Sequence, residues 1–393
     1  MTTNDVPQYP TDLFTDDALA EPYEHYRAIR DAGPVVWLPA HDVYAVGRHR
    51  DVGAVLDDAT TFCSGQGVGL NDFINEGGRG TTLMSDGDDH RAMRAVISPP
   101  LTPRAVAALR PAAQAIADAL VDALLDRGQV DAVTDLAAVL PATWVPDLLG
   151  WPADGRDHLL DWAGATFDGL GPLNDRAAAA GGAILEMLGF AHELAASDLP
   201  RDSMAAGILA AAERGEIAHD RCPMAIVDYL GPSLDTTISG IGNAIWLFAT
   251  NPREWERLRA DPGRVRHAFN EALRVESPIS CFTRVTTTDA AVDGVTIPAG
   301  SRVLVSFASA NRDERRWTDP ERFDITREVA DQVAFGHGEH ACVGMGLARL
   351  EGAAILSALV TRVDRIELAG PPVRKLNNLI RSFASLPVTL RPA

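Results

Sequence analysis

One ten-residue segment constrains the chain more than any other part of the sequence. FGHGEHACVG (335–344) sets three glycines around a single cysteine, and a predicted helix (343–363) follows at once. Glycine lets the backbone approach the sulfur closely, so that amide N–H groups can hydrogen-bond to it. A thiol at a helix N-terminus also lies at the positive end of the helix dipole, which favours the thiolate. The segment therefore predicts a metal-ligating thiolate at Cys342, although a lone cysteine is more often a buried, inert thiol.

Two other motifs precede this segment, and together the three resemble a known family. EALR (271–274) places Glu271 and Arg274 one turn apart on a helix, and DPERFD (319–324) follows with Arg322. In the form FxxGxxxCxG, the 335–344 segment resembles the haem-binding loop of the cytochrome P450 family. The resemblance covers residues 20–392 and implies a haem-thiolate monooxygenase that uses O₂. It also implies that Glu271, Arg274 and Arg322 form a buried ion network near the haem.

The periodicity of apolar residues predicts a mainly α chain with a minor β part. We expect a single P450 domain over residues 1–393, with an irregular lead-in over 1–20. The predicted helices cover 23–32, 50–58, 103–127, 131–149, 156–168, 175–195, 203–214, 223–250 and 343–363, and two more fall within 253–276. A hairpin is predicted at 34–47, a long loop at 63–80, and strands within 282–310 and 364–392.

The resemblance implies which residues hold the cofactor, haem b. Cys342 is the axial ligand of the haem iron, and Phe335 and Gly336 belong to the loop around it. HRAMR (90–94) is similar to the family's pair of residues that bind the haem propionates. The propionate-binding set implied by the resemblance is His90, Arg94, Arg284 and His340.

Oxygen activation is expected in the apolar helix at 223–250. LDTT (234–237) places an acid beside an alcohol, and the resemblance gives Thr236 a hydrogen bond to the bound oxygen and Asp235 the relay of protons from solvent. Pro232 departs from the family pattern. It has no N–H and crowds the carbonyl of Asp228, so we expect a kink there that opens the oxygen groove.

The substrate is the least constrained part of the analysis. Segments 60–73, 164–175 and 309–317 are similar to bacterial monooxygenases of para-substituted benzoates, such as 4-methoxybenzoate demethylases. The positions that would bind the carboxylate hold Gln66, Val227 and Asp228. We therefore expect a small aromatic with a phenol, amide or amine end, oxidised by hydroxylation or O-demethylation. The expected pocket residues are Gln66, Asn71, Phe167, Leu170, Asp228, Gly231 and Phe282, although Asp228 reads equally well as a solvated helix residue.

Composition indicates which classes of partner and which cellular location to expect. The chain has 54 acidic against 35 basic residues, a net charge of −19, which argues against a nucleic-acid or anionic-membrane partner. Four cysteines without a CxxC pair indicate a reducing cytoplasm. Neither a signal peptide nor an apolar run of ~18 residues is apparent, so no membrane span is expected.

Electrons must reach the site from outside the chain, because it carries no flavin domain and no cysteine cluster. We expect a ferredoxin and a ferredoxin reductase that draws on NAD(P)H, docked on a basic patch that includes Arg315, Arg316 and Arg349. The alternatives are a peroxide-driven peroxygenase, a monooxygenase of a larger secondary metabolite, and a non-catalytic haem module. A zinc protein fits less well, because the cysteines lack ligand spacing.

Overall fold

The computed structural model of the protein describes residues 6–153 and 156–393. Its α-helices are α1 (Asp16–Ala20), α2 (Tyr23–Ala32), α3 (His49–Asp57), α4 (Asp72–Gly77), α5 (Gly87–Ile97), α6 (Pro103–Leu125), α7 (Val139–Leu149), α8 (Leu159–Gly169), α9 (Asp175–Ala195), α10 (Met204–Glu213), α11 (Cys222–Leu230), α12 (Asp235–Thr250), α13 (Pro252–Ala260), α14 (Val265–Val275), α15 (Phe307–Ala310) and α16 (Met345–Arg362). Its strands are β1 (Val36–Leu38), β2 (Val43–Val46), β3 (Phe62–Cys63), β4 (Gln129–Asp131), β5 (Cys281–Thr286), β6 (Ala290–Val292), β7 (Val295–Ile297), β8 (Arg302–Ser306), β9 (Val363–Leu368), β10 (Val373–Lys375), β11 (Ser382–Ser385) and β12 (Pro387–Pro392). The prediction of a mainly α chain with a minor β part is confirmed.

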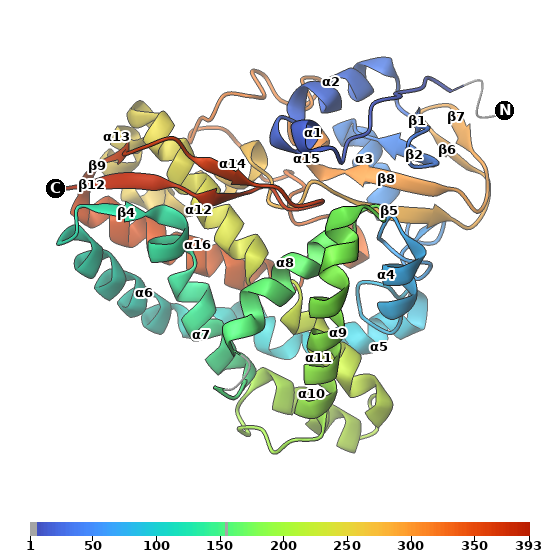
Figure 1. The fold of residues 1–393 in the computed structure, drawn as a ribbon, viewed down its shortest axis with the longest axis horizontal. Coiled ribbons are helices and arrows are strands. Elements are labelled where there is room, and N and C mark those ends of the chain that lie inside the picture. The colour runs from blue at the N-terminus through green and yellow to red at the C-terminus, as the bar shows by residue number, and fades with distance from the viewer. Residues whose placement is uncertain (1–5, 154–155) are drawn as a thin grey trace.

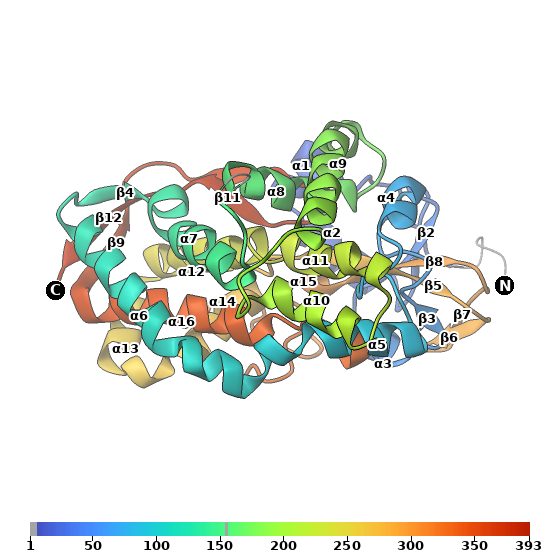
Figure 2. The same cartoon turned by 90° about the horizontal axis from the view of Figure 1, so that it is seen from below.

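The two larger sheets lie at opposite ends of the molecule. The five-stranded sheet, in the order β1-β2-β8-β5-β3, is at the N-terminal end, and the three-stranded sheet β4-β12-β9 is beside the C-terminus (Figure 1). Strands β2 and β8 pair in parallel, and the other pairs of the larger sheet are antiparallel. The helices fill the space between the sheets, with α12 and α16 in the middle and α6 packed along α16 (Figure 2).

Two hydrophobic clusters form the core. One is built by the helices around α12 and α16, and the other by the five-stranded sheet together with α3 and the end of α8. Residues of both clusters line one large cavity, which therefore lies where the clusters meet. The fold thus places a cavity between rigid helical and β parts, as is common for small-molecule sites.

Three sequence-based boundaries are wrong in detail. The lead-in over 1–20 contains α1, whose first turn is capped by the Thr15 hydroxyl, while residues 1–5 lie outside the described ranges. The predicted loop at 63–80 contains α4, where the Asn71 side chain caps the helix by accepting from the Ile74 N–H. The single helix predicted over 223–250 is two helices, α11 and α12, separated by four residues.

The break between α11 and α12 follows from Pro232. Proline cannot donate to the carbonyl of Asp228, and its ring crowds that carbonyl. The last backbone bond of α11 runs from the Gly231 N–H to the Val227 carbonyl, and the ladder resumes with Ile238 bonding to Leu234. The expected kink is therefore a full interruption of the helix.

One stretch is long and apolar enough to cross a membrane by length and composition. It is Ala132–Leu149, and 56% of it is buried inside the protein. A π-type turn over Ala132–Ala137 precedes α7, and the stretch packs within the helical core cluster. A core helix can be equally long and apolar, and the buried fraction of this stretch is that expected of a core helix.

Candidate functional site

Cys342 lies at the end of a tight turn that is built by glycines. Gly336 and Gly338 have φ angles of +69° and +70°, and a Cβ on Gly338 would lie 2.5 Å from the Leu56 carbonyl oxygen. Only glycine tolerates both the left-handed backbone and this approach. The Cys342 N–H donates to the Phe335 carbonyl over 2.8 Å and closes the turn directly before α16. The turn holds the thiol at the wall of the cavity.

Opposing influences act on the protonation of this thiol. Burial raises the pKa of Cys342, whereas the backbone N–H groups of Gly344 and Met345 and the guanidinium of Arg94 lower it. The helix-terminal amides therefore favour the thiolate, as expected, without overcoming burial. A bound metal cation supplies the missing positive charge, because coordination deprotonates a thiol outright.

The cavity beside this thiol holds about 520 Å³. Phe335 and Gly336 of the cysteine turn form part of its wall, and α8, α11 and the start of α12 form other parts. Most of its lining is apolar, which excludes water and strengthens each polar contact inside it.

Four basic side chains gather near the thiol, and several of their polar atoms lack partners. Arg94, Arg284 and His340 line the cavity, while His90 stacks on His340 with ring centroids 4.2 Å apart. Both ring nitrogens of His90 and Nε2 of His340 are buried without a hydrogen-bond partner among the described residues. Burial lowers the pKa of Arg284 to about 10. Buried donors of this kind need an anion, and they fit the two carboxylates of haem above a thiolate ligand.

The acid–alcohol pair lies at the first turn of α12. Thr236 lines the cavity, and its hydroxyl donates to the Pro232 carbonyl over 2.9 Å, an acceptor that the helix break leaves free. Asp235 is buried next to it and does not itself line the cavity. Its Oδ2 lies 3.3 Å from Nζ of Lys375, whose side chain is 39% exposed. The pair therefore connects the cavity wall to solvent through one lysine.

The Glu271–Arg274 pair is bidentate and completely buried. Nε and Nη2 of Arg274 donate to the two carboxylate oxygens of Glu271 over 2.7 and 2.8 Å. The third residue of this network is Arg327, with Nε 3.2 Å from Glu271 Oε1. The prediction for Arg322 is wrong, because its side chain is 56% exposed and 3.7 Å from the Asp324 carboxylate. Only the backbone carbonyl of Arg322 takes part, accepting from Arg274.

The structure brings together five of the seven expected pocket residues. Those that line the cavity are Phe167, Leu170, Asp228, Gly231 and Phe282. The predictions for Gln66 and Asn71 are wrong. The Asn71 amide donates to the carbonyls of Gly169 and Gly171 over 2.8 and 2.7 Å, so it joins α4 to the end of α8 instead of facing the cavity. Gln66 lies outside the lining, and its carbonyl accepts from Arg302.

Asp228 is a half-buried carboxylate in the cavity wall, not a solvated helix residue. Its Oδ2 accepts from the N–H and the hydroxyl of Thr82 over 2.8 and 2.6 Å. These bonds fasten the loop before α5 to α11. Burial raises the pKa of Asp228 to about 6, although the Thr82 bonds act in the opposite direction.

We expect Asp228 to make the free energy of unfolding depend on pH. A carboxyl whose pKa is raised by folding stabilises the folded state below its unfolded pKa, and this contribution is lost as the pH rises through about 6. Between pH 4 and pH 8 the loss amounts to about 2 kcal/mol. Asp228→Asn removes this pH dependence. In urea denaturation, the free energy of unfolding of the variant should therefore increase relative to that of the wild type as the pH rises. Asp202→Asn, at an exposed site, is the control, and an unchanged difference at both pH values would contradict the expectation.

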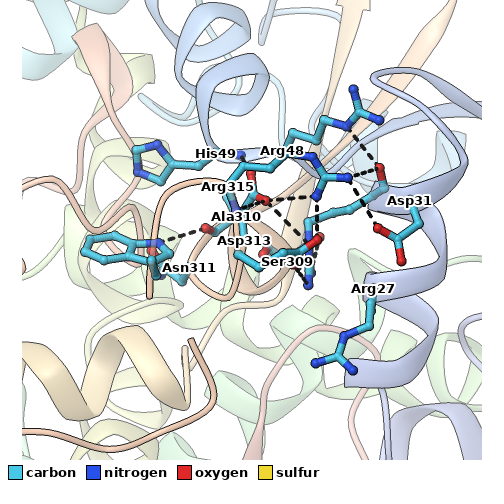
Figure 3. Close-up of polar contacts among 12 residues, drawn as sticks. Arg27, Asp31, Arg48, His49, Ser309, Ala310, Asn311, Asp313 and Arg315 are labelled. Atoms are coloured by element: carbon cyan, nitrogen blue, oxygen red, sulfur yellow. Dashed lines mark hydrogen bonds and ion pairs between the residues drawn. The ribbon is translucent and has the colours of Figure 1, made fainter. Parts of the chain in front are cut away.

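The expected basic patch is largely neutralised. The Arg315 guanidinium lies between Asp31 and Asp313, at 3.3 and 3.2 Å (Figure 3). Arg316 Nε donates to the Asp331 carboxylate over 2.7 Å. Arg349 stacks over the Phe335 ring at 4.8 Å, beside the cysteine turn. A docking patch formed by all three arginines is therefore not what the structure presents, and Arg349 alone touches the thiol loop.

Several residues of the site escaped sequence reasoning. Lys375 and Arg327 come from segments far along the chain from their acidic partners, and no spacing rule connects them. Thr82 and Ser233 also line the cavity, and Ser233 Oγ is buried without a hydrogen-bond partner among the described residues. One sequence feature could have drawn attention to Lys375: it is the single lysine of the chain.

Comparisons with known proteins find relatives that align with nearly the whole chain. A family model described as Cytochrome P450 matches residues 183–379. The chain is 43% identical to Cytochrome p450 CYP199A2 of Rhodopseudomonas palustris, over 99% of this chain and 95% of that protein. It is 34% identical to Cytochrome P450 107B1 of Saccharopolyspora erythraea, over 99% of both. The structure of Cytochrome P450 CYP109Q5 from Chondromyces apiculatus superposes with a TM-score of 0.83 at 30% identity, covering 98% of this chain and 99% of that one.

Proposed function

The chain belongs to the cytochrome P450 family and is a haem-thiolate monooxygenase, and we propose that it oxidises a small, mostly apolar aromatic substrate with electrons from a ferredoxin. The proposed reaction is hydroxylation or O-demethylation. One observation carries this proposal: a single apolar cavity has the Cys342 thiol in one wall and aromatic side chains, Phe167 and Phe282, in others.

The residues around the cavity divide into those that hold the cofactor and those that act on the substrate. Cys342 would ligate the iron, Arg94 and Arg284 would neutralise the haem carboxylates, and His90 and His340 would donate hydrogen bonds to them. When bound, the haem supplies the redox chemistry with which one atom of O₂ enters the substrate. The apolar walls exclude water, so that protons reach the site only where a side chain delivers them.

The first turn of α12 is the proposed route for those protons. Thr236 presents its hydroxyl to the cavity while it donates to the Pro232 carbonyl, and it can pass a proton on when it accepts another. Asp235 lies behind it and can exchange protons with solvent along Lys375. Nζ of Lys375 donates to Asp235 Oδ2 over 3.3 Å, so it orients that carboxylate beside Thr236.

We expect Thr236→Ala to separate reductant consumption from product formation. Loss of a positioned proton donor typically costs 10²–10⁴-fold in rate, and electrons not used for product would appear as hydrogen peroxide. Thr237→Ala is the matched control, because Thr237 is the adjacent alcohol and also lines the cavity. Measuring NADH consumed, product formed and peroxide released in parallel tests the assignment. Equal uncoupling in the two variants would contradict the role given to Thr236.

The proposed function is tested with an aryl methyl ether, 4-tert-butylanisole. With a ferredoxin and an NADH-dependent ferredoxin reductase, we expect a ligand-induced shift of the haem absorption and a phenol formed in equal amount to formaldehyde or, if the ring or butyl group is attacked, a hydroxylated ether. Product from hydrogen peroxide alone at an equal rate would favour the peroxygenase instead. The absence of both shift and product with small aryl ethers would overturn the small-aromatic assignment.

A further inference from the structure

Charge is distributed unevenly around the cavity. Of the described residues that line it, the basic ones are Arg94, Arg284, His337 and His340, and all but Arg284 lie on α5 or the cysteine turn. Arg94, Arg284 and His340 are those assigned to the haem carboxylates. The acidic lining residues are Glu76 on α4, Asp228 on α11 and Glu351 on α16. The cavity therefore keeps no free arginine for the anionic end of a substrate.

Asp228 has unused capacity for a ligand. Thr82 donates both of its hydrogen bonds to Oδ2, and the neighbouring Leu83 N–H also lowers the pKa of the carboxyl, but no charged side chain donates a hydrogen bond to Asp228 among the described residues. Close by along the chain, in the break after α11, the Ser233 hydroxyl is buried and has no hydrogen-bond partner within the part of the chain that the structure describes. Both residues face the same cavity as Phe167 and Phe282. A carboxylate in an apolar cavity wall with no paired cation attracts one, since an opposite charge offsets the cost of its desolvation.

Resting on the function proposed above, we propose that the site selects aromatic substrates that carry a cationic amine or ammonium group, with Asp228 as the counter-ion. A carboxylate in the same place would meet a like charge in apolar surroundings and would need a proton on one of the two groups. The proposed preference for a cation follows from the charge of Asp228 and not from the size of the cavity.

The charged groups that face Asp228 do not neutralise it. Arg94 on α5 donates to the Ala341 carbonyl and belongs to the haem-carboxylate set. Arg221, at the start of α11, is already paired with Asp89 over 2.8 and 3.1 Å. Tyr229 donates its hydroxyl to the Ile97 carbonyl. Because burial raises the pKa of Asp228 to about 6, the affinity for a cation should increase between pH 5 and pH 7.5.

Three probes that share a para-substituted methoxyphenyl group test the proposal on the haem-loaded protein. They are the cation 4-methoxy-N,N,N-trimethylanilinium, its neutral isostere 4-tert-butylanisole, and the anion 4-methoxybenzoate. The quaternary nitrogen has no lone pair, so it cannot ligate iron and imitate binding. By calorimetry and by the shift of the haem absorption at pH 7.5, we expect the cation to bind roughly tenfold or more tightly than the neutral probe, and the anion to bind weakest.

Two variants distinguish the effect of the charge on Asp228 from the effect of its hydrogen bonds to Thr82. Asp228→Asn should abolish the preference for the cation and its pH dependence while leaving the affinity for the neutral probe within about twofold. Thr82→Val removes one bond to Asp228 but keeps the charge, so it should retain the preference. Equal binding of cation and neutral probe by the wild type, tightest binding of the benzoate, or a preference that survives in Asp228→Asn would each overturn the proposal.

The same experiment distinguishes this proposal from the function on which it rests. Calorimetry reports binding whether or not the protein turns over, and the absorption of the reduced carbon monoxide complex reports the thiolate ligand separately. A missing thiolate signature would count against the proposed function alone. An intact signature with no charge selectivity would count against Asp228 alone.

Discussion

Replacing Cys342 by serine should abolish monooxygenation, with turnover falling on the order of 10³-fold or more. The serine hydroxyl is a far poorer electron donor than a thiolate, and it retains its proton under conditions in which the metal removes the proton of a thiol. The turn itself should survive, because the Cys342 N–H that closes it onto Phe335 belongs to the backbone. The defect is therefore expected in chemistry rather than in folding.

The measurement is the absorption of the reduced carbon monoxide complex, together with product formed per NADH. The wild type should show the red-shifted band of a thiolate opposite carbon monoxide, and Cys342→Ser should lose that band while it retains its far-UV circular dichroism. Cys281→Ala is the matched control, because Cys281 is a buried cysteine of β5 whose thiol has a pKa raised to about 12. Turnover that persists in Cys342→Ser would refute the assignment of the ligand.

Local sequence was sufficient to find the cysteine turn. The glycines at 336 and 338 have left-handed φ angles, which glycine adopts without the steric cost of a Cβ. Sequence therefore encodes the turn directly. The distortion at Pro232 could also be predicted from the chemistry of proline, but only as a kink in one helix, whereas the structure has two separate helices there. These features depend on interactions within a few residues, which is why they could be predicted.

Side-chain direction in irregular segments could not be predicted. Residues 319–327 contain both Arg322 and Arg327, and nothing in their spacing says which guanidinium turns inward, because the segment has no period. Asn71 looked like a pocket residue until the structure placed it at a helix cap. Lys375 reaches Asp235 from a strand 140 positions further along the chain. Such contacts depend on tertiary packing, which a single sequence does not reveal.

The largest effect on stability is expected at Arg274. Arg274→Met removes the bidentate partner of the Glu271 carboxylate, which is 0% exposed, and leaves it only one bond from a side chain, that of Arg327; removing one partner of a buried pair costs about 3–5 kcal/mol. It also removes the donors to the carbonyls of Asn311 and Pro320, at 2.7 and 2.8 Å. Urea denaturation followed by circular dichroism measures the change, and haem absorbance reports whether the variant still holds its cofactor.

Two further variants decide which arginine completes the network. Arg327→Met should cost about 1.5–3 kcal/mol, the range for a hydrogen bond to a charged group, because Arg327 donates to Glu271. Arg322→Met should change stability by no more than about 0.5 kcal/mol, since an exposed side chain contributes little. Both residues are arginines of the same loop, so the two variants differ only in whether the lost side chain points into the protein or into solvent. If Arg322→Met proved the more destabilising, the network would be built as the family motif implied, and the position given to Arg327 would be wrong.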